Sequence, residues 1–226
     1  MKRYALAMIT ACTTVFLSQT GMAQKAQWVK THSWSGHGTK QTEMFPVNGQ
    51  KWRIRYYPEG EGLFQIAVYN EQNELLDMAA NQDRAFPLKG FASLKGGGHR
   101  YLGITGLNTT WTVVVEQYLT AIEEWKLRQT MKQPGPELAK VGTWTGESGE
   151  AQYAFRIPAG SWQILCTQEG RGLLQVEVVD EEGFVALAAN SDRPGQSVSW
   201  VHKTGTFSIK VKSDGPSWKI DVLAEP

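Results

Sequence analysis

The sequence predicts an all-β protein built from two tandem antiparallel β-sandwich domains of a jelly-roll-like kind, joined by a short helix and a Pro-Gly linker. Two observations carry this prediction. Apolar residues recur at every second position in short runs bounded by Gly, Asn, Asp and Pro, which is the period of strands with one buried face. The stretch EGEGLFQIAVYN at residues 59–70 also returns as EGRGLLQVEVVD at residues 169–180.

Residues 1–23 predict a signal peptide. Lys2 and Arg3 precede an apolar run, and small residues lead up to Ala23. If the chain were instead a bacterial lipoprotein, Cys12 would become its lipid-modified N-terminus. Only eleven residues precede Cys12, which is unusually few for such a leader, so we favour cleavage after Ala23. No second apolar segment follows, and we therefore expect no integral membrane segment after cleavage and a periplasmic or extracellular location.

The two halves of the remaining chain match in order. Tryptophan, phenylalanine and tryptophan recur at a spacing of 110 residues in the pairs Trp34/Trp144, Phe45/Phe155 and Trp52/Trp162. Matches that keep one order over whole halves favour duplication of a single domain plan. We expect a first sandwich at residues 24–118 and a second at 137–226, each with seven or eight strands; a small barrel is the main structural alternative.

Residues 119–136 break the strand alternation and predict a helical linker. Thr120 and Glu123 have the spacing of a capping box, and Glu124 with Arg128 forms an i,i+4 ion pair. The segment Pro134-Gly135-Pro136 ends the helix. We expect this element to space the two domains.

Charge and cysteine content exclude some partners. Removal of Lys2 and Arg3 leaves 21 basic residues against 22 acidic ones, a net charge of about −1. Nucleic acid is therefore not an expected partner, because phosphate binding requires clustered Lys and Arg. The cleaved chain keeps only Cys166 and cannot form an internal disulfide, so ordinary hydrophobic cores must stabilise it.

The strand pattern resembles that of the bacterial pre-peptidase C-terminal type of β-sandwich. The residues that carry the resemblance run from Phe45 to Val115: Phe45-x-Val47, Gly49-x-x-Trp52-x-Ile54, Gly98-x-x-Tyr101-Leu102-x-Ile104 and Trp111-x-Val113-x-Val115. The resemblance implies a non-catalytic secreted module of the kind that is appended to hydrolases and that in some cases binds carbohydrate or protein. This chain departs from the pattern in its many tryptophans and in having no enzyme attached.

No motif predicts catalysis, a cofactor or a metal site, and we expect no enzyme. The four histidines have no HxH or HExxH spacing and are expected on surfaces or loops: His32, His37, His99 and His202. Cys166 takes the inward position of Tyr56 and is expected to be a buried structural thiol. The pairs Asn81/Asp83 and Asn190/Asp192 follow strands; we favour ordinary turns, with the next arginine pairing with Glu59 or Glu169, and leave calcium ligation open.

Candidate ligand-binding residues are those that the two halves do not share. They are Trp28, Trp125 and Trp200, together with Arg53, Arg55 and Tyr57 on the outward side of one strand. Aromatics on a sheet face stack on sugar rings, and Arg with Tyr is typical of binding hot spots. The alternative is that Trp28 and Trp125 pack the interdomain contact and that Trp200 covers its own sheet edge.

The sequence therefore predicts an exported, non-catalytic binding or interaction protein whose partner is a polysaccharide or an envelope protein. Two alternatives remain. One is an enzyme or enzyme inhibitor that uses the interdomain cleft, and the other is a structural subunit of an envelope assembly that pairs through a strand edge.

Overall fold

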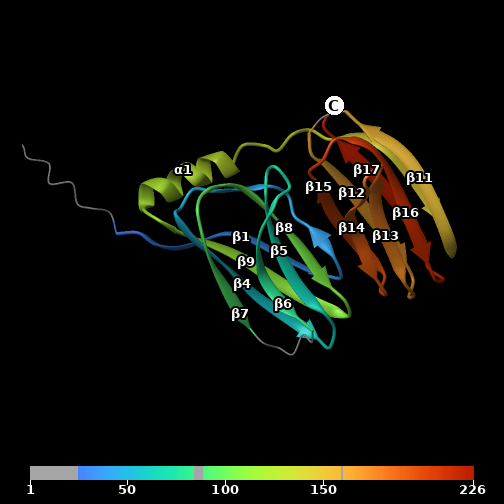
Figure 1. The fold of residues 1–226 in the computed structure, drawn as a ribbon, viewed down its shortest axis with the longest axis horizontal. Helices are drawn as coiled ribbons and strands as arrows, with labels where there is room; N and C mark the ends of the chain where they lie inside the picture. Colours follow the sequence, from blue (N-terminus) through green and yellow to red (C-terminus); the bar gives the residue numbers. More distant parts are fainter. Residues whose placement is uncertain (1–24, 84–88, 159) are drawn as a thin grey trace, which may run out of the picture.

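The computed structural model describes residues 25–83, 89–158 and 160–226. The expected signal peptide and Cys12 lie outside these residues. Within them, the first half forms two facing antiparallel sheets (Figure 1). One sheet has the order β1-β9-β4-β7, with β1 Gln27–His37, β9 Thr109–Leu119, β4 Lys51–Gly60 and β7 Gly90–Lys95. The other has the order β2-β8-β5-β6, with β2 Lys40–Gln41, β8 Gly98–Gly106, β5 Phe64–Asn70 and β6 Leu75–Gln82, while β3 Phe45–Val47 also pairs with β8.

The second half repeats this strand order. Its first sheet is β10-β17-β12-β15, with β10 Ala139–Gly146, β17 Ser217–Ala224, β12 Trp162–Glu169 and β15 Gly195–Val201. Its second sheet is β11-β16-β13-β14, with β11 Gly149–Ile157, β16 Gly205–Ser213, β13 Leu174–Asp180 and β14 Gly183–Ser191. Counted within each half, the first, eighth, third and sixth strands share one sheet, which is the eight-stranded jelly-roll arrangement. The predicted class, all-β with two sandwiches, is confirmed.

Each sandwich encloses its own hydrophobic core. In β4 the inward side chains of Trp52 and Ile54 are buried, and in β12 Trp162 and Ile164 occupy the same places. Their neighbours on each strand point outward and are partly or fully exposed. The period of two in the sequence therefore separates the residues that hold each sandwich together from those available for binding.

The two tight turns of the repeated EGxGL stretch depend on glycine. Gly60 and Gly172 have φ angles of 136° and 126°, values that L side chains rarely adopt. At Gly62 glycine is required for a different reason: a Cβ atom at this position would lie 1.5 Å from the carbonyl oxygen of Leu107.

The linker helix α1, Ala121–Met131, begins with the predicted capping box at Thr120 and Glu123 and carries the Glu124–Arg128 ion pair at 2.7 Å. Its one buried residue, Leu127, packs against Val29 and Leu119 of the first sandwich. The helix is thus part of the first domain. The expectation that it spaces the two domains is wrong, because the two sandwiches lie side by side and touch directly (Figure 1).

The contact between the sandwiches is made by β2 of the first against β14 and β15 of the second. The backbone N–H of Gln41 donates to Ser199 Oγ at 3.2 Å. Gly38, at φ 74°, lies so close to Asn190 that a Cβ would be 2.2 Å from the Asn190 carbonyl oxygen. The domains therefore meet backbone to backbone at this point.

Candidate functional site

The outer face of the β1-β9-β4-β7 sheet brings together four of the six predicted site residues. Strand β4 alternates strictly, so that Arg53, Arg55 and Tyr57 point away from the core, as the sequence predicts. Strand β1 adds Trp28, whose side of the strand also faces outward. Tyr118 of β9, which the sequence analysis did not single out, is the direct cross-strand partner of Trp28.

Three of these side chains form one contact cluster. The rings of Trp28 and Tyr118 lie 5.4 Å apart at an angle of 59°, and the Arg53 guanidinium carbon lies 4.2 Å from the centre of the Trp28 ring. Trp28 nevertheless keeps 40% of its surface exposed. The ring is held in place by its neighbours, and part of its surface stays accessible to a ligand.

Glu116, also on β9, positions the two arginines. Its carboxylate accepts from Arg53 Nε at 2.5 Å and lies 3.6 Å from Arg55 Nη1. Arg55 in turn lies 5.7 Å from the centre of the Tyr57 ring. Lys89, which directly precedes β7, has its Nζ 5.9 Å from the centre of the same ring. The result is a connected layer of aromatic and cationic groups that are ordered before any ligand arrives.

The matching face of the second sandwich has a different chemistry. Gln163, Leu165 and Thr167 stand on β12 where the first sandwich has Arg53, Arg55 and Tyr57. The centre of the face is the buried carboxylate of Asp221, which accepts from Thr143 Oγ1 at 2.5 Å and pairs with two lysines, Lys140 at 3.2 Å and Lys219 at 2.8 Å. The bond from Lys219 and that from Thr143 lower the pKa of Asp221 to about 2. The charged side chains at the centre of this face are therefore paired with one another.

The two other predicted tryptophans lie elsewhere. Trp125 is on α1 and is 62% exposed. Trp200 faces outward from β15, stacks on His202 with ring centres 6.4 Å apart, and lines a groove between the two sandwiches that also contains Met131 and Pro136. The alternative that Trp28 and Trp125 pack the interdomain contact is wrong, since that contact is made by β2 with β14 and β15.

His202 lies in the loop that follows β15, as expected of a surface or loop histidine, but its side chain is buried at the domain contact and is not on the surface. Its Nε2 donates to the Thr42 carbonyl of the first sandwich at 3.0 Å, and its Nδ1 lies 2.8 Å from Ser161 Oγ. Tyr101 packs on its ring at 4.4 Å. Burial lowers the pKa of His202, against the opposing effect of the bond to Thr42. Local sequence offers no signal for a contact that joins residues 160 positions apart.

Asn81 and Asn190, which were expected in turns after strands, lie within β6 and β14, and two of the four candidate calcium ligands contact other side chains. Asn81 Oδ1 accepts from Gln65 Nε2 at 2.8 Å, and Asp192 lies 3.6 Å from His37 Nε2 across the domain contact. Arg193 lies 3.7 Å from Asp192, and not beside Glu169 as the sequence analysis suggested; Arg84, its counterpart in the first half, lies outside the described residues. In the described part of the chain, no three His, Cys, Asp or Glu side chains are grouped to hold a metal ion.

Cys166 is buried in the core of the second sandwich, as predicted. Burial raises the pKa of its thiol to about 12. The thiol therefore stays protonated at neutral pH and is a poor nucleophile.

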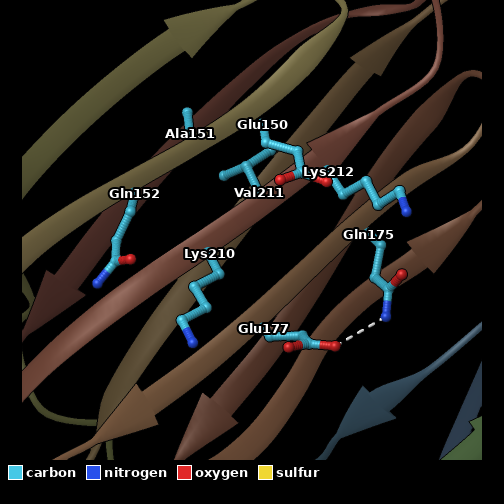
Figure 2. Close-up of a pocket in the computed structure, with 8 residues that line it drawn as sticks. All are labelled: Glu150, Ala151, Gln152, Gln175, Glu177, Lys210, Val211 and Lys212. Atoms are coloured by element: carbon cyan, nitrogen blue, oxygen red, sulfur yellow. Dashed lines mark hydrogen bonds between the residues drawn. The ribbon is translucent and has the colours of Figure 1, made fainter.

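A polar hollow on the β11-β16-β13 surface offers a useful contrast (Figure 2). Two lysines there face acidic side chains on neighbouring strands: Lys212 is opposite Glu150, and Lys210 is opposite Glu177. Gln175 Nε2 donates to Glu177 at 2.8 Å. This surface is balanced in charge, since its lining contains two lysines and two glutamates.

None of the described helices is long and apolar enough to span a membrane.

No family model matches the sequence, and no curated protein sequence matches it. Among solved structures, the chain is similar to the major capsid protein of bacteriophage PM2, at 9% identity over 88% of this chain and 97% of that one, with a TM-score of 0.27. The exported protein XepA of PBSX gives 9% identity over 88% and 86% of the two chains and a TM-score of 0.28. A fucolectin from the serum of the striped bass, Morone saxatilis, gives 8% identity over 86% and 85% and a TM-score of 0.23. Likenesses of this size carry no argument about function.

Proposed function

We propose that the protein is an exported, non-catalytic binding module whose ligand surface is the outer face of the β1-β9-β4-β7 sheet. One observation carries the proposal: Arg53 contacts both the ring of Trp28 and the carboxylate of Glu116 on this face, and the ring stays partly exposed. On the matching face of the second sandwich, the charged side chains pair with one another around Asp221. Side chains that are ordered and still exposed bind with a small loss of conformational entropy.

Carbohydrate is the ligand class that this face supports best. An aromatic ring kept 40% exposed on a flat sheet can stack on a sugar ring, and arginines beside it can donate to hydroxyl oxygens. An envelope protein is the second ligand class, because tryptophan, tyrosine and arginine also dominate protein interfaces. The resemblance to secreted pre-peptidase C-terminal modules agrees with either ligand.

Tryptophan fluorescence of the purified protein, titrated with neutral and acidic polysaccharides, tests the proposal. We expect a saturable change, and we expect calorimetric titration of Trp28→Ala to show that the binding itself is lost and not only the fluorescence of one ring. The matched controls Trp125→Ala and Trp200→Ala remove one tryptophan from the helix and one from the interdomain groove, and both variants should keep their binding. Loss of binding only in Trp200→Ala would move the site to the groove, and the absence of any response would remove carbohydrate as the ligand.

A structural role in an envelope assembly is the second candidate, because of strand β6. Among the residues that the structure describes, this edge strand pairs only with β5. Its side chains Leu75, Leu76 and Met78 are exposed by 55%, 47% and 42%. Exposed apolar edges are templates for pairing with another chain. Light scattering coupled to size-exclusion chromatography would favour this role if the protein formed oligomers that Leu76→Lys dissociates.

An enzyme in the interdomain cleft receives less support. The Ser161–His202 pair resembles a nucleophile and its base, but His202 is held between Thr42, Ser161 and Tyr101. We interpret His202 as a residue that binds the first sandwich through Thr42, and Ser161 as the neighbour that orients its ring. Covalent labelling of Ser161 by a fluorophosphonate would contradict this interpretation.

Export itself is tested by cell fractionation. We expect the chain to begin at residue 24 in the periplasmic or extracellular fraction. A protein with its leader intact in the cytoplasm would overturn this part of the proposal.

A further inference from the structure

The proposed ligand face has an excess of positive charge. Among the described residues, six basic side chains lie on or beside it against two acidic ones; the basic ones are Lys30, Lys51, Arg53, Arg55, Lys89 and Lys95, and the acidic ones are Glu59 and Glu116. Glu116 is committed to the two arginines. Within the described parts of the chain, none of the four lysines forms an ion pair: Lys30, Lys51, Lys89 and Lys95.

Two of these lysines directly oppose each other. Lys51 of β4 and Lys95 of β7 are cross-strand partners, and both are exposed. Like charges in this position are destabilising, by roughly 0.2–1 kcal/mol. At the same place in the second sandwich, Ser161 and His202 are hydrogen-bonded at 2.8 Å. The first sandwich thus carries a repulsion that an anion between the two ammonium groups would relieve.

The lysine pair continues a row that begins with the aromatic rings. Trp28 is opposite Tyr118, and Lys51 precedes Trp52, which is opposite Gln117, so Lys51 stands beside Tyr118. The row therefore runs Trp28, Tyr118, Lys51, Lys95 across four neighbouring strands and spans about 14 Å at the usual strand spacing. One half offers ring faces and the other half offers positive charge.

From this row we infer that the ligand is an acidic polysaccharide, whose sugar rings rest on Trp28 and Tyr118 and whose carboxylate or sulfate groups lie between Lys51 and Lys95. The inference rests on the proposed function, because it names the ligand class of the same surface. A polysaccharide chain that carries both sugar rings and anionic groups fits a row with two aromatic rings at one end and two lysines at the other.

Other polyanions fit less well. The whole chain is close to neutral, at +1 before any cleavage, whereas nucleic-acid binding depends on a larger basic surface. An acidic peptide would pair with the lysines but would have no flat ring to place on Trp28. Nucleic acid remains an outcome of the test.

The experiment compares each acidic polymer with its neutral twin. The purified protein is titrated with polygalacturonate and with its methyl ester, and with dextran sulfate and dextran, in about 0.02 M and about 0.3 M salt. We expect binding to the acidic member of at least one pair, weakened at high salt, and at least tenfold weaker binding to the neutral twin. Single-stranded DNA of comparable charge serves as the non-sugar polyanion.

Matched double variants locate the charge effect. Lys51→Gln/Lys95→Gln should weaken binding to the acidic polymer about fivefold, as expected from the loss of two exposed ion pairs. Lys210→Gln/Lys212→Gln removes the same charge from the balanced surface of Figure 2 and should leave binding unchanged. Trp28→Ala should weaken binding to acidic and neutral polymers alike.

The outcomes separate this inference from the proposed function. Equal binding of a polymer and its neutral twin would keep carbohydrate binding and overturn the acidic ligand. DNA that binds as tightly as the acidic polysaccharides would overturn the preference for sugar. Equal losses in the two lysine variants would remove the site from this row, and no binding to any polysaccharide would overturn both proposals together.

Discussion

The outer faces of the β4 sheet and the β12 sheet share one strand order and differ in almost every outward side chain. In the first, Lys51 opposes Lys95 and Arg53 lies over Trp28. In the second, Ser161 bonds His202 and two lysines close on Asp221. The inward residues of the two sheets are alike because packing dictates them. The difference between the outward residues is the basis of our proposal that the first face binds a ligand, whereas the second contributes to stability.

The largest expected effect comes from the outer face of the β12 sheet, where the polar side chains are bonded to one another. His202→Ala removes hydrogen bonds to Thr42 and Ser161 and the contact with Tyr101, and should lower the free energy of unfolding by roughly 3 kcal/mol. Lys95→Ala, at the matching place on the outer face of the β4 sheet, should change the free energy of unfolding by less than about 0.5 kcal/mol. Urea unfolding of both variants measures the difference, and equal losses would break the comparison.

The same residue predicts an acid dependence. Because burial lowers the pKa of His202 from its ordinary 6.5, the unfolded chain takes up a proton that the folded protein does not bind as the pH falls below 6.5. Stability therefore falls with the pH in this range. His202→Ala should reduce this slope without removing it, since burial also lowers the pKa of His32 and of His37.

A smaller effect is expected at Asp221. Asp221→Asn keeps the shape of the side chain but removes the charge that binds Lys140, Lys219 and Thr143, and should cost about 1.5 kcal/mol at neutral pH.

The pH profile checks the cause of this loss. The folded protein holds the pKa of Asp221 at about 2, below the ordinary 3.8, so its contribution is present above 3.8 and is lost as the pH falls towards 2. The wild type and the variant should therefore converge in stability near pH 2. A gap that persists there would mean that packing, and not charge, causes the loss.

The smallest effect has the opposite sign. Lys95→Glu replaces a cross-strand repulsion with an ion pair to Lys51 and should raise the free energy of unfolding by about 0.5 kcal/mol. If the row binds an anion, the same change should weaken binding to acidic polysaccharides. A variant that gains stability and keeps its binding would show that the lysine pair has no functional role.

Much of the fold could be predicted from the sequence because it depends on local periodicity. The alternation in β4 predicted that Arg53, Arg55 and Tyr57 face outward, and the spacing of Thr120 and Glu123 predicted the start of α1. Tyr118 was missed because its importance depends on strand register, which places it beside Trp28. Register is set by pairing between strands far apart in the chain and leaves no trace in either strand alone.

The contact between the sandwiches could not be predicted for the same reason. Thr42 and His202 are each unremarkable in their own segments, and only the approach of β2 to β15 brings them together. The sequence also gave no sign that the second strand of the first sandwich is divided into β2 and β3. Its counterpart β11 is continuous over nine residues, whereas the buried Thr42 follows β2 and its hydroxyl accepts from the N–H of Leu102.

The glycine at position 38 gives the molecule a mechanical property that depends on a single atom. A methyl group at this position would overlap the Asn190 carbonyl of the other sandwich, and the backbone there has a φ of 74°, which alanine disfavours. Gly38→Ala would therefore push the two sandwiches apart at this point, and we expect it to broaden the distance distribution between spin labels on the two sandwiches. The close approach of β2 to the second sandwich thus requires that residue 38 has no Cβ atom.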